Sequence, residues 1–158
     1  MSHVATVAPV IKNLDALERA CEELGLVLKR GQRTHKWYGT WVQDYNAEDA
    51  AYRHGIRPED YGKCEHAIGV QDNPDAYEIG LVTNPQGEGY KMAFDFWAGG
   101  RGLIDKIGGK NAEALCQEYG VQVALQEVQH LAEEGWQISQ VKQPNGDVQV
   151  IATSPGQW

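Results

Sequence analysis

Three short apolar segments in the middle of the chain, separated by turn sequences, constrain the fold most. They span residues 64–70, 77–82 and 90–97. The connections, residues 72–75 and 84–89, consist of Asp, Asn, Pro, Gly and similar types that favour tight turns. In the last segment the large apolar side chains alternate and share one face: Tyr90, Met92, Phe94 and Phe96. The pattern predicts an antiparallel meander of three strands.

Helical patterns flank this meander on both sides. Residues 14–24 carry apolar side chains at three- and four-residue spacing, with Asn13 as N-cap and Gly25 as the stop. Two more helices are predicted, over 111–119 and over 122–134. The second has a wide apolar stripe made of Val121, Ala124, Leu125, Val128, Leu131 and Ala132.

The remaining segments complete an α+β fold. Strands are predicted over 4–11, 26–29, 35–43, 136–142 and 147–152, the last two joined by the hairpin turn Pro144-Asn145-Gly146. We expect a mostly antiparallel sheet with two to three helices packed on one face. The 158 residues fit a single domain, 1–158, in which residues 44–63 are predicted to be an insertion or excursion.

Charge and composition exclude several classes of function. Fourteen basic and twenty-two acidic residues give a net charge of −8, which argues against general binding to nucleic acid. No apolar run is long enough to span a bilayer, and the first residues do not resemble a signal peptide. The three cysteines, Cys21, Cys64 and Cys116, are predicted to be free thiols in a reducing compartment, so we expect a cytoplasmic protein.

Aromatic and basic residues are concentrated between positions 33 and 45. Trp37, Tyr38 and Trp41 follow Arg33 and Lys36 closely. Aromatic faces with neighbouring cations stack on flat rings and hold phosphates or other anions. The alternative is that one face of this predicted strand simply forms core beneath the sheet.

A glycine-rich segment follows the third meander strand and gives a second candidate site. Trp97 precedes residues 98–102, which contain Arg101, and Lys106 comes soon after. Such a loop can direct backbone N–H groups at an anion while the cations add charge. The sequence matches neither a P-loop nor a dinucleotide fingerprint. The alternative interpretation is a flexible connection from strand to helix.

Other polar residues carry weaker signals. Asp95, on the face opposite Phe94, is either a buried acid or an exposed carboxylate, and we expect it to face water. Cys64 and His66 share a strand face, but their spacing fits no standard zinc module, so we predict neither a metal nor a cofactor. No serine or cysteine lies in a recognisable nucleophile motif, and no catalytic residue is predicted.

Three stretches together resemble the small plastid and cyanobacterial ycf thirty-five family, which also occurs in bacteria and phages. The first is residues 1–17, which begin Met-Ser-His. The second is residues 77–82, with Glu78-Ile79-Gly80, followed by residues 93–97, with Phe94-Asp95-Phe96-Trp97. The third is residues 134–136, with Gly135-Trp136, followed by residues 145–150, with Asn145-Gly146-Asp147. The resemblance implies an α+β fold, no established activity and a link to AAA-type ATPases. The chain departs from the family at residues 31–65 and at its final Gln157-Trp158.

The first functional hypothesis is a non-enzymatic protein that binds a small anionic, nucleotide-like ligand. In a phage, such a protein would act as a sponge that sequesters a host immune signal. Its predicted ligand-binding residues are Arg33, Lys36, Trp37, Tyr38, Trp41, Trp97, Arg101 and Lys106. The alternative is a protein-interaction module that uses Trp37, Trp41 and the insertion to bind an AAA-type ATPase or to form a homo-oligomer. An enzyme, such as a nucleotide hydrolase, ranks third.

Overall fold

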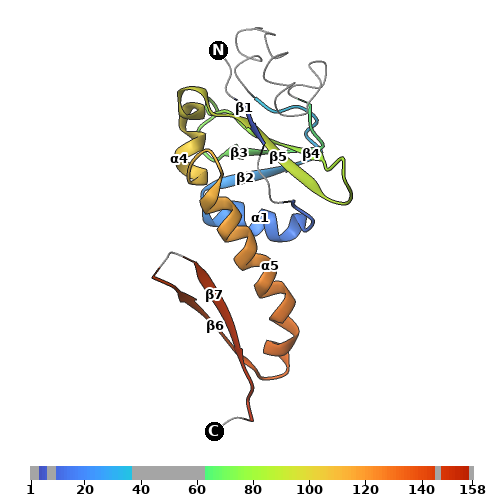
Figure 1. The fold of residues 1–158 in the computed structure, drawn as a ribbon, viewed down its shortest axis with the longest axis vertical. Coiled ribbons are helices and arrows are strands. Elements are labelled where there is room, and N and C mark those ends of the chain that lie inside the picture. Colours follow the sequence, from blue (N-terminus) through green and yellow to red (C-terminus); the bar gives the residue numbers. More distant parts are fainter. Residues whose placement is uncertain (1–3, 7–9, 37–62, 145–146, 157–158) are drawn as a thin grey trace.

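The computed structural model describes residues 4–6, 10–36, 63–144 and 147–156. One five-stranded sheet lies at one end of the molecule, and a long helix leads from it to a separate hairpin (Figure 1). In chain order the elements are β1 (Val4–Thr6), α1 (Leu14–Glu23), β2 (Leu26–Arg30), β3 (His66–Val70), β4 (Ile79–Thr83), β5 (Tyr90–Asp95), the short turn η2 (Trp97–Gly102), α4 (Leu103–Ile107), α5 (Glu113–Glu133), β6 (Gln137–Lys142) and β7 (Val148–Thr153).

The predicted meander is confirmed as the centre of the sheet. The strand order is β1-β5-β4-β3-β2, and every pair is antiparallel. Residues directly opposite one another in such a pair point to the same face. One face therefore carries large apolar side chains, and the opposite face carries mostly small or polar ones. We call the first the helix face and the second the open face.

The helix face forms the hydrophobic core together with the helices. Leu26, Ile68, Ile79, Leu81, Met92 and Phe94 from the strands cluster with Leu17 of α1, Leu103 and Ile107 of α4 and Leu115 of α5. As predicted, Asn13 caps α1, and its side-chain oxygen accepts a hydrogen bond from the Ala16 N–H at 3.0 Å. Gly25 follows the helix with a positive φ of 73°, as a C-terminal stop requires. The α+β fold class is confirmed.

The expected number of later helices is wrong, and one short helix was not predicted. The segments 111–119 and 122–134 form one continuous helix, α5, with Gly120 in its interior. A glycine there costs only about 1 kcal/mol relative to alanine, which the helix tolerates. The short helix α4 was not predicted from the sequence, because its five residues, Leu-Ile-Asp-Lys-Ile, lie between glycine-rich segments.

The second half of α5 does not pack on the sheet, contrary to expectation. It extends past α1 and lies beside the predicted hairpin of β6 and β7 (Figure 1). Within α5, Leu115 is fully buried and Val121 is 5% exposed, whereas no described residue from 122 to 156 is buried. We call residues 122–156 the arm.

The contrast between the two parts of α5 can be measured with two substitutions. Leu115→Ala should lower the free energy of unfolding by about 2–5 kcal/mol, because it leaves a cavity in the core. Leu125→Ala, at a half-exposed position of the same helix, should cost clearly less. Urea denaturation of both variants compares them, and equal losses would contradict this division of α5.

Candidate functional site

The open face of the sheet carries small residues at its centre, and we call this area the floor. Ala67, Gly80 and Ala93 lie opposite one another on β3, β4 and β5, so one small residue from each strand points to this face. The segment from Thr34 to Lys36 lies across the floor, and a Cβ atom added to Gly80 would collide with the His35 ring. Small residues thus allow this segment to approach the strands.

Glu78 fastens that segment to the sheet. Its side chain is only 4% exposed and accepts three hydrogen bonds. The donors are Lys29 Nζ at 2.7 Å, Gln32 Nε2 at 3.0 Å and the backbone N–H of Lys36 at 3.0 Å. The backbone N–H of Glu78 also donates to the Lys36 carbonyl oxygen at 2.9 Å. Because both carboxylate oxygens are occupied, Glu78 has a structural role here and is not a free acid or base.

His35 is buried beside Glu78 in its neutral form. Its Nδ1 is 3.1 Å from the Glu78 carbonyl oxygen, which can only accept, so Nδ1 carries the proton. Burial lowers the pKa of His35, although the nearby Glu78 and Asp95 carboxylates act in the opposite direction. Asp95 is fully buried, so the expectation that it faces water is wrong. It is the last residue of β5, two residues before the turn η2, and it lies on the open face together with Ala93.

The glycine-rich segment forms a left-handed turn at one end of the sheet. Ala98, Gly99, Gly100 and Arg101 all have φ between 53° and 66° and ψ between 20° and 39°. A left-handed conformation costs roughly 1–2 kcal/mol for each non-glycine residue. The turn is held by the Gly100 carbonyl oxygen, which accepts from the Tyr77 N–H at 2.9 Å.

Lys36 and Arg101 both contact the turn between β3 and β4. Lys36 Nζ donates to the Pro74 carbonyl oxygen at 2.8 Å, and Asn73 Nδ2 donates to the Arg101 carbonyl oxygen at 3.2 Å. The Arg101 guanidinium lies 6.0 Å from the centre of the Tyr77 ring. The structure therefore brings Lys36, through its side chain, and Arg101, through its backbone, to the same turn at one end of the sheet.

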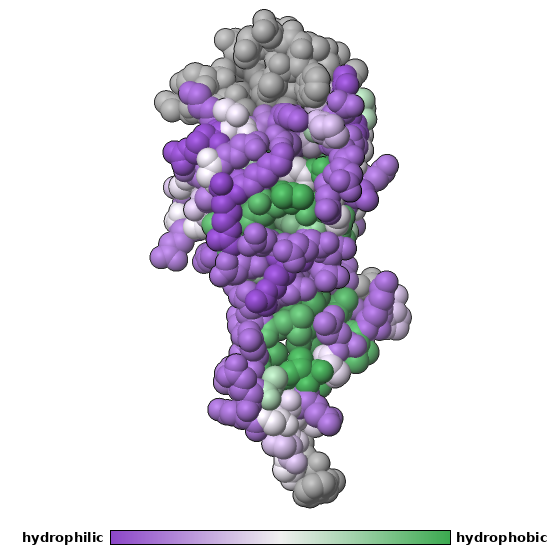
Figure 2. All heavy atoms as spheres, turned by 180° about the vertical axis from the view of Figure 1, so that it is seen from behind, coloured by the Kyte–Doolittle hydropathy of each residue, from purple (hydrophilic) through white to green (hydrophobic). Residues whose placement is uncertain are grey.

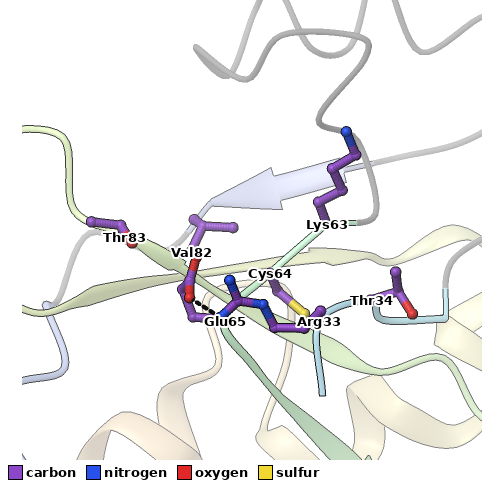
Figure 3. Close-up of a pocket in the computed structure, with 7 residues that line it drawn as sticks. All are labelled: Arg33, Thr34, Lys63, Cys64, Glu65, Val82 and Thr83. Atoms are coloured by element: carbon purple, nitrogen blue, oxygen red, sulfur yellow. Dashed lines mark hydrogen bonds and ion pairs between the residues drawn. The ribbon is translucent and has the colours of Figure 1, made fainter. Parts of the chain in front are cut away.

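Arg33 lies near the other end of β3, where the surface is hollowed. It forms an ion pair with Glu65, and the Lys63 side chain points away from that pair (Figure 3). The open hollow measures about 530 Å³ and is lined by Arg33, Thr34, Lys63, Cys64, Glu65, Val82 and Thr83. Because Arg33 has an acidic partner and lies away from the β3–β4 turn, it does not join Lys36 and Arg101.

The remaining predicted site residues divide into two groups. Lys106 is exposed on α4, and its Nζ lies close to Gly25 rather than to Arg101. Trp37, Tyr38 and Trp41, most of the insertion at 44–63, and the Trp97 side chain lie outside the described residues. The aromatic part of the predicted site and the interaction surface at the insertion therefore stay predictions.

Sequence reasoning missed Glu78 and the role of His35. The available signal was the alternation along β4, where Glu78 and Gly80 share a face opposite the apolar Ile79 and Leu81. A charged residue in line with a glycine marks a face on which another segment lies close to the backbone.

The three thiols are unpaired in the structure, as predicted, and they are poor nucleophiles. Burial raises the pKa of Cys21 to about 12 and that of Cys64 to about 11. It also raises the pKa of Cys116. Since the thiolate is the reactive form, none of them is activated at neutral pH.

No known protein family matches the chain, and no curated protein or solved structure matches it either. The resemblance to the ycf thirty-five family therefore stays a prediction. Among the described residues, no helix is both long enough and apolar enough to cross a membrane.

The close fit of His35 on Gly80 predicts opposite effects at two glycines. Gly80→Ala should destabilise the fold by about 1–3 kcal/mol, because the new methyl group must displace His35. Gly120→Ala is the matched control, since no atom lies within 4 Å of its Cβ position. It should stabilise α5 by about 0.5–1 kcal/mol. Thermal or urea unfolding measures both effects. If Gly120→Ala destabilised the fold and Gly80→Ala did not, the close contact between His35 and Gly80 would be refuted.

The lowered pKa of His35 makes stability depend on pH. As the pH falls below about 6.5, the unfolded chain binds a proton at residue 35 that the folded chain does not bind. Stability from this group is therefore complete above that pH and is lost as the pH decreases. The free energy of unfolding between pH 7.5 and 5.5, about one unit on each side of the ordinary histidine pKa, should fall more in the wild type than in His35→Gln. Parallel losses in the two proteins would contradict this account.

Proposed function

We propose that this chain is a non-enzymatic binding protein that captures a small anionic, nucleotide-like ligand at the β3–β4 end of its sheet. The observation that supports it is the meeting of Lys36 and Arg101 at one turn, although they are far apart in the sequence. Trp37 follows Lys36 directly in the sequence, and Trp97 begins the turn that carries Arg101. Lys36 is thus adjacent in the chain to an aromatic residue able to stack on a base, and Arg101 lies four residues after one.

The electrostatics of the chain explain why these cations matter. A net charge of −8 repels anions at long range, so capture depends on positive charges that act locally. Asp72 and Asp75 are exposed in the same turn and oppose an anion there. Affinity should therefore rest on close contacts with Lys36 and Arg101 rather than on attraction from solution.

The chemistry of the described residues favours binding over catalysis. Both oxygens of Glu78 are occupied, His35 is buried against the sheet, and the thiols have raised pKa values. None of these groups is placed to activate water or to attack a phosphate. The biological role that we propose for such a protein is that of a phage sponge, which sequesters a host immune signal.

A thermal-shift screen with cyclic and ADP-ribose-type nucleotides tests the proposal, followed by calorimetry on variants. Arg101→Ala and Lys36→Ala should each remove a charge-assisted hydrogen bond of about 1.5–3 kcal/mol, or one to two decades in affinity. Trp37→Ala should lose a stacking contact of about 1–3 kcal/mol. Arg19→Ala, which removes an exposed cation on α1, is the control and should bind normally.

Two results would overturn the proposal. If no nucleotide in the screen shifts the melting temperature, ligand capture of this class is wrong. If a nucleotide binds but Lys36→Ala and Arg101→Ala bind it as tightly as the wild type, the ligand lies elsewhere.

A further inference from the structure

The arm lacks a hydrophobic core of its own. None of its described residues is buried, and hydrophobic side chains gather on its surface over α5 and the hairpin (Figure 2). A two-stranded hairpin is marginally stable in water and needs further strands or extensive packing. The helix covers one side of this hairpin only, so the arm is an incomplete sheet in a single copy of the chain.

The free edge of β6 is the exposed side of that sheet. Five of the six residues in β6 are exposed, against two of the six in β7. Val141, in β6, is 42% exposed and is one of the two most exposed large apolar residues described. The strand closer to α5 is β7, so β6 is the edge that a further strand can reach.

The hairpin register shows which backbone groups point outward from β6. The Gln143 N–H donates to the Asp147 carbonyl oxygen at 2.6 Å, and these residues lie directly opposite one another. Hydrogen-bonded and non-bonded pairs alternate along an antiparallel ladder. The N–H and C=O groups of Ile138, Gln140 and Lys142 therefore face away from β7.

Charge distinguishes this edge from the β2 edge of the main sheet. The edge strand β2 carries Lys29 and Arg30, and charges of this kind discourage edge-to-edge pairing. In the hairpin, β7 has no charged residue and β6 has only Lys142, at its end. In a chain with a net charge of −8, this strand offers a surface that lacks acidic side chains, so the paired strands themselves do not repel one another.

We propose that β6 pairs antiparallel with β6 of a second copy of this chain, which makes a four-stranded sheet ordered β7-β6-β6-β7. A two-fold axis through Gln140 places Gln140 opposite its own copy and Lys142 opposite Ile138. That register pairs all three outward-facing residues and keeps the two lysines apart. It also places both α5 helices on the same face of the shared sheet.

Light scattering coupled to size exclusion tests the pairing, with a dimer of twice the 17.5 kDa chain as the expected result. Gln140→Pro removes one outward N–H and leaves the hairpin's own hydrogen bonds intact, so it should abolish the dimer. Gln140→Ala keeps the N–H and should remain dimeric. A monomeric wild type at high micromolar concentration, or a Gln140→Pro variant that still dimerises, would overturn the proposal.

A crosslink supplies a second test that does not depend on the proline variant folding. Hydrogen-bonded residues opposite one another in antiparallel strands have Cα atoms about 5.5 Å apart, within the range of a disulfide. Gln140→Cys should form a covalent dimer under mild oxidation. Gln149→Cys, at an exposed position on β7, should not, and the wild type with its native thiols sets the background. Crosslinking at position 149 but not at 140 would refute the β6 register.

Discussion

The buried carboxylate of Glu78 holds the open face of the sheet together. It is one of twenty-two acidic residues, yet its side chain is almost completely removed from water. A buried charge is tolerated only when its hydrogen-bonding capacity is used, and here donors from β2 and from residues 32–36 use it. Through these bonds Glu78 fixes where the chain runs after it leaves β2, and so where Lys36 lies.

The two faces of the sheet show how one set of strands serves two purposes. On the helix face, bulky side chains such as Ile79, Leu81 and Phe94 exclude water and supply most of the stability. On the open face, Ala67, Gly80 and Ala93 leave room for a crossing segment. The stable layer thus supports a second layer whose position is set by polar contacts rather than by apolar packing.

Periodicity and turn chemistry were enough to predict the regular parts of the fold. The capped helix α1, the meander and the hairpin all follow from local patterns. The continuity of α5 did not, because a glycine such as Gly120 weakens a helix only slightly and tertiary contacts on both sides decide the outcome. The burial of Asp95 was also missed, and so was that of Glu78, whose hydrogen-bond donors come from distant segments. Of the candidate site, the meeting of Lys36 and Arg101 follows from long-range contacts that no single segment of the sequence specifies.

The single helix α5 also joins the two ends of the molecule mechanically. Its Tyr119 hydroxyl accepts from the Lys12 and Asn13 N–H groups at 3.1 Å, and Gln126 accepts from the Asn13 side chain at 2.6 Å. Tyr119 and Gln126 lie on opposite sides of Gly120 in the sequence, and both bind the residues at the start of α1. A helix of 21 residues is about 31 Å long, so it behaves as a stiff rod at this scale. A force applied to the hairpin is therefore transmitted along α5 to the sheet, and the contacts with the start of α1 are the point at which the helix is held.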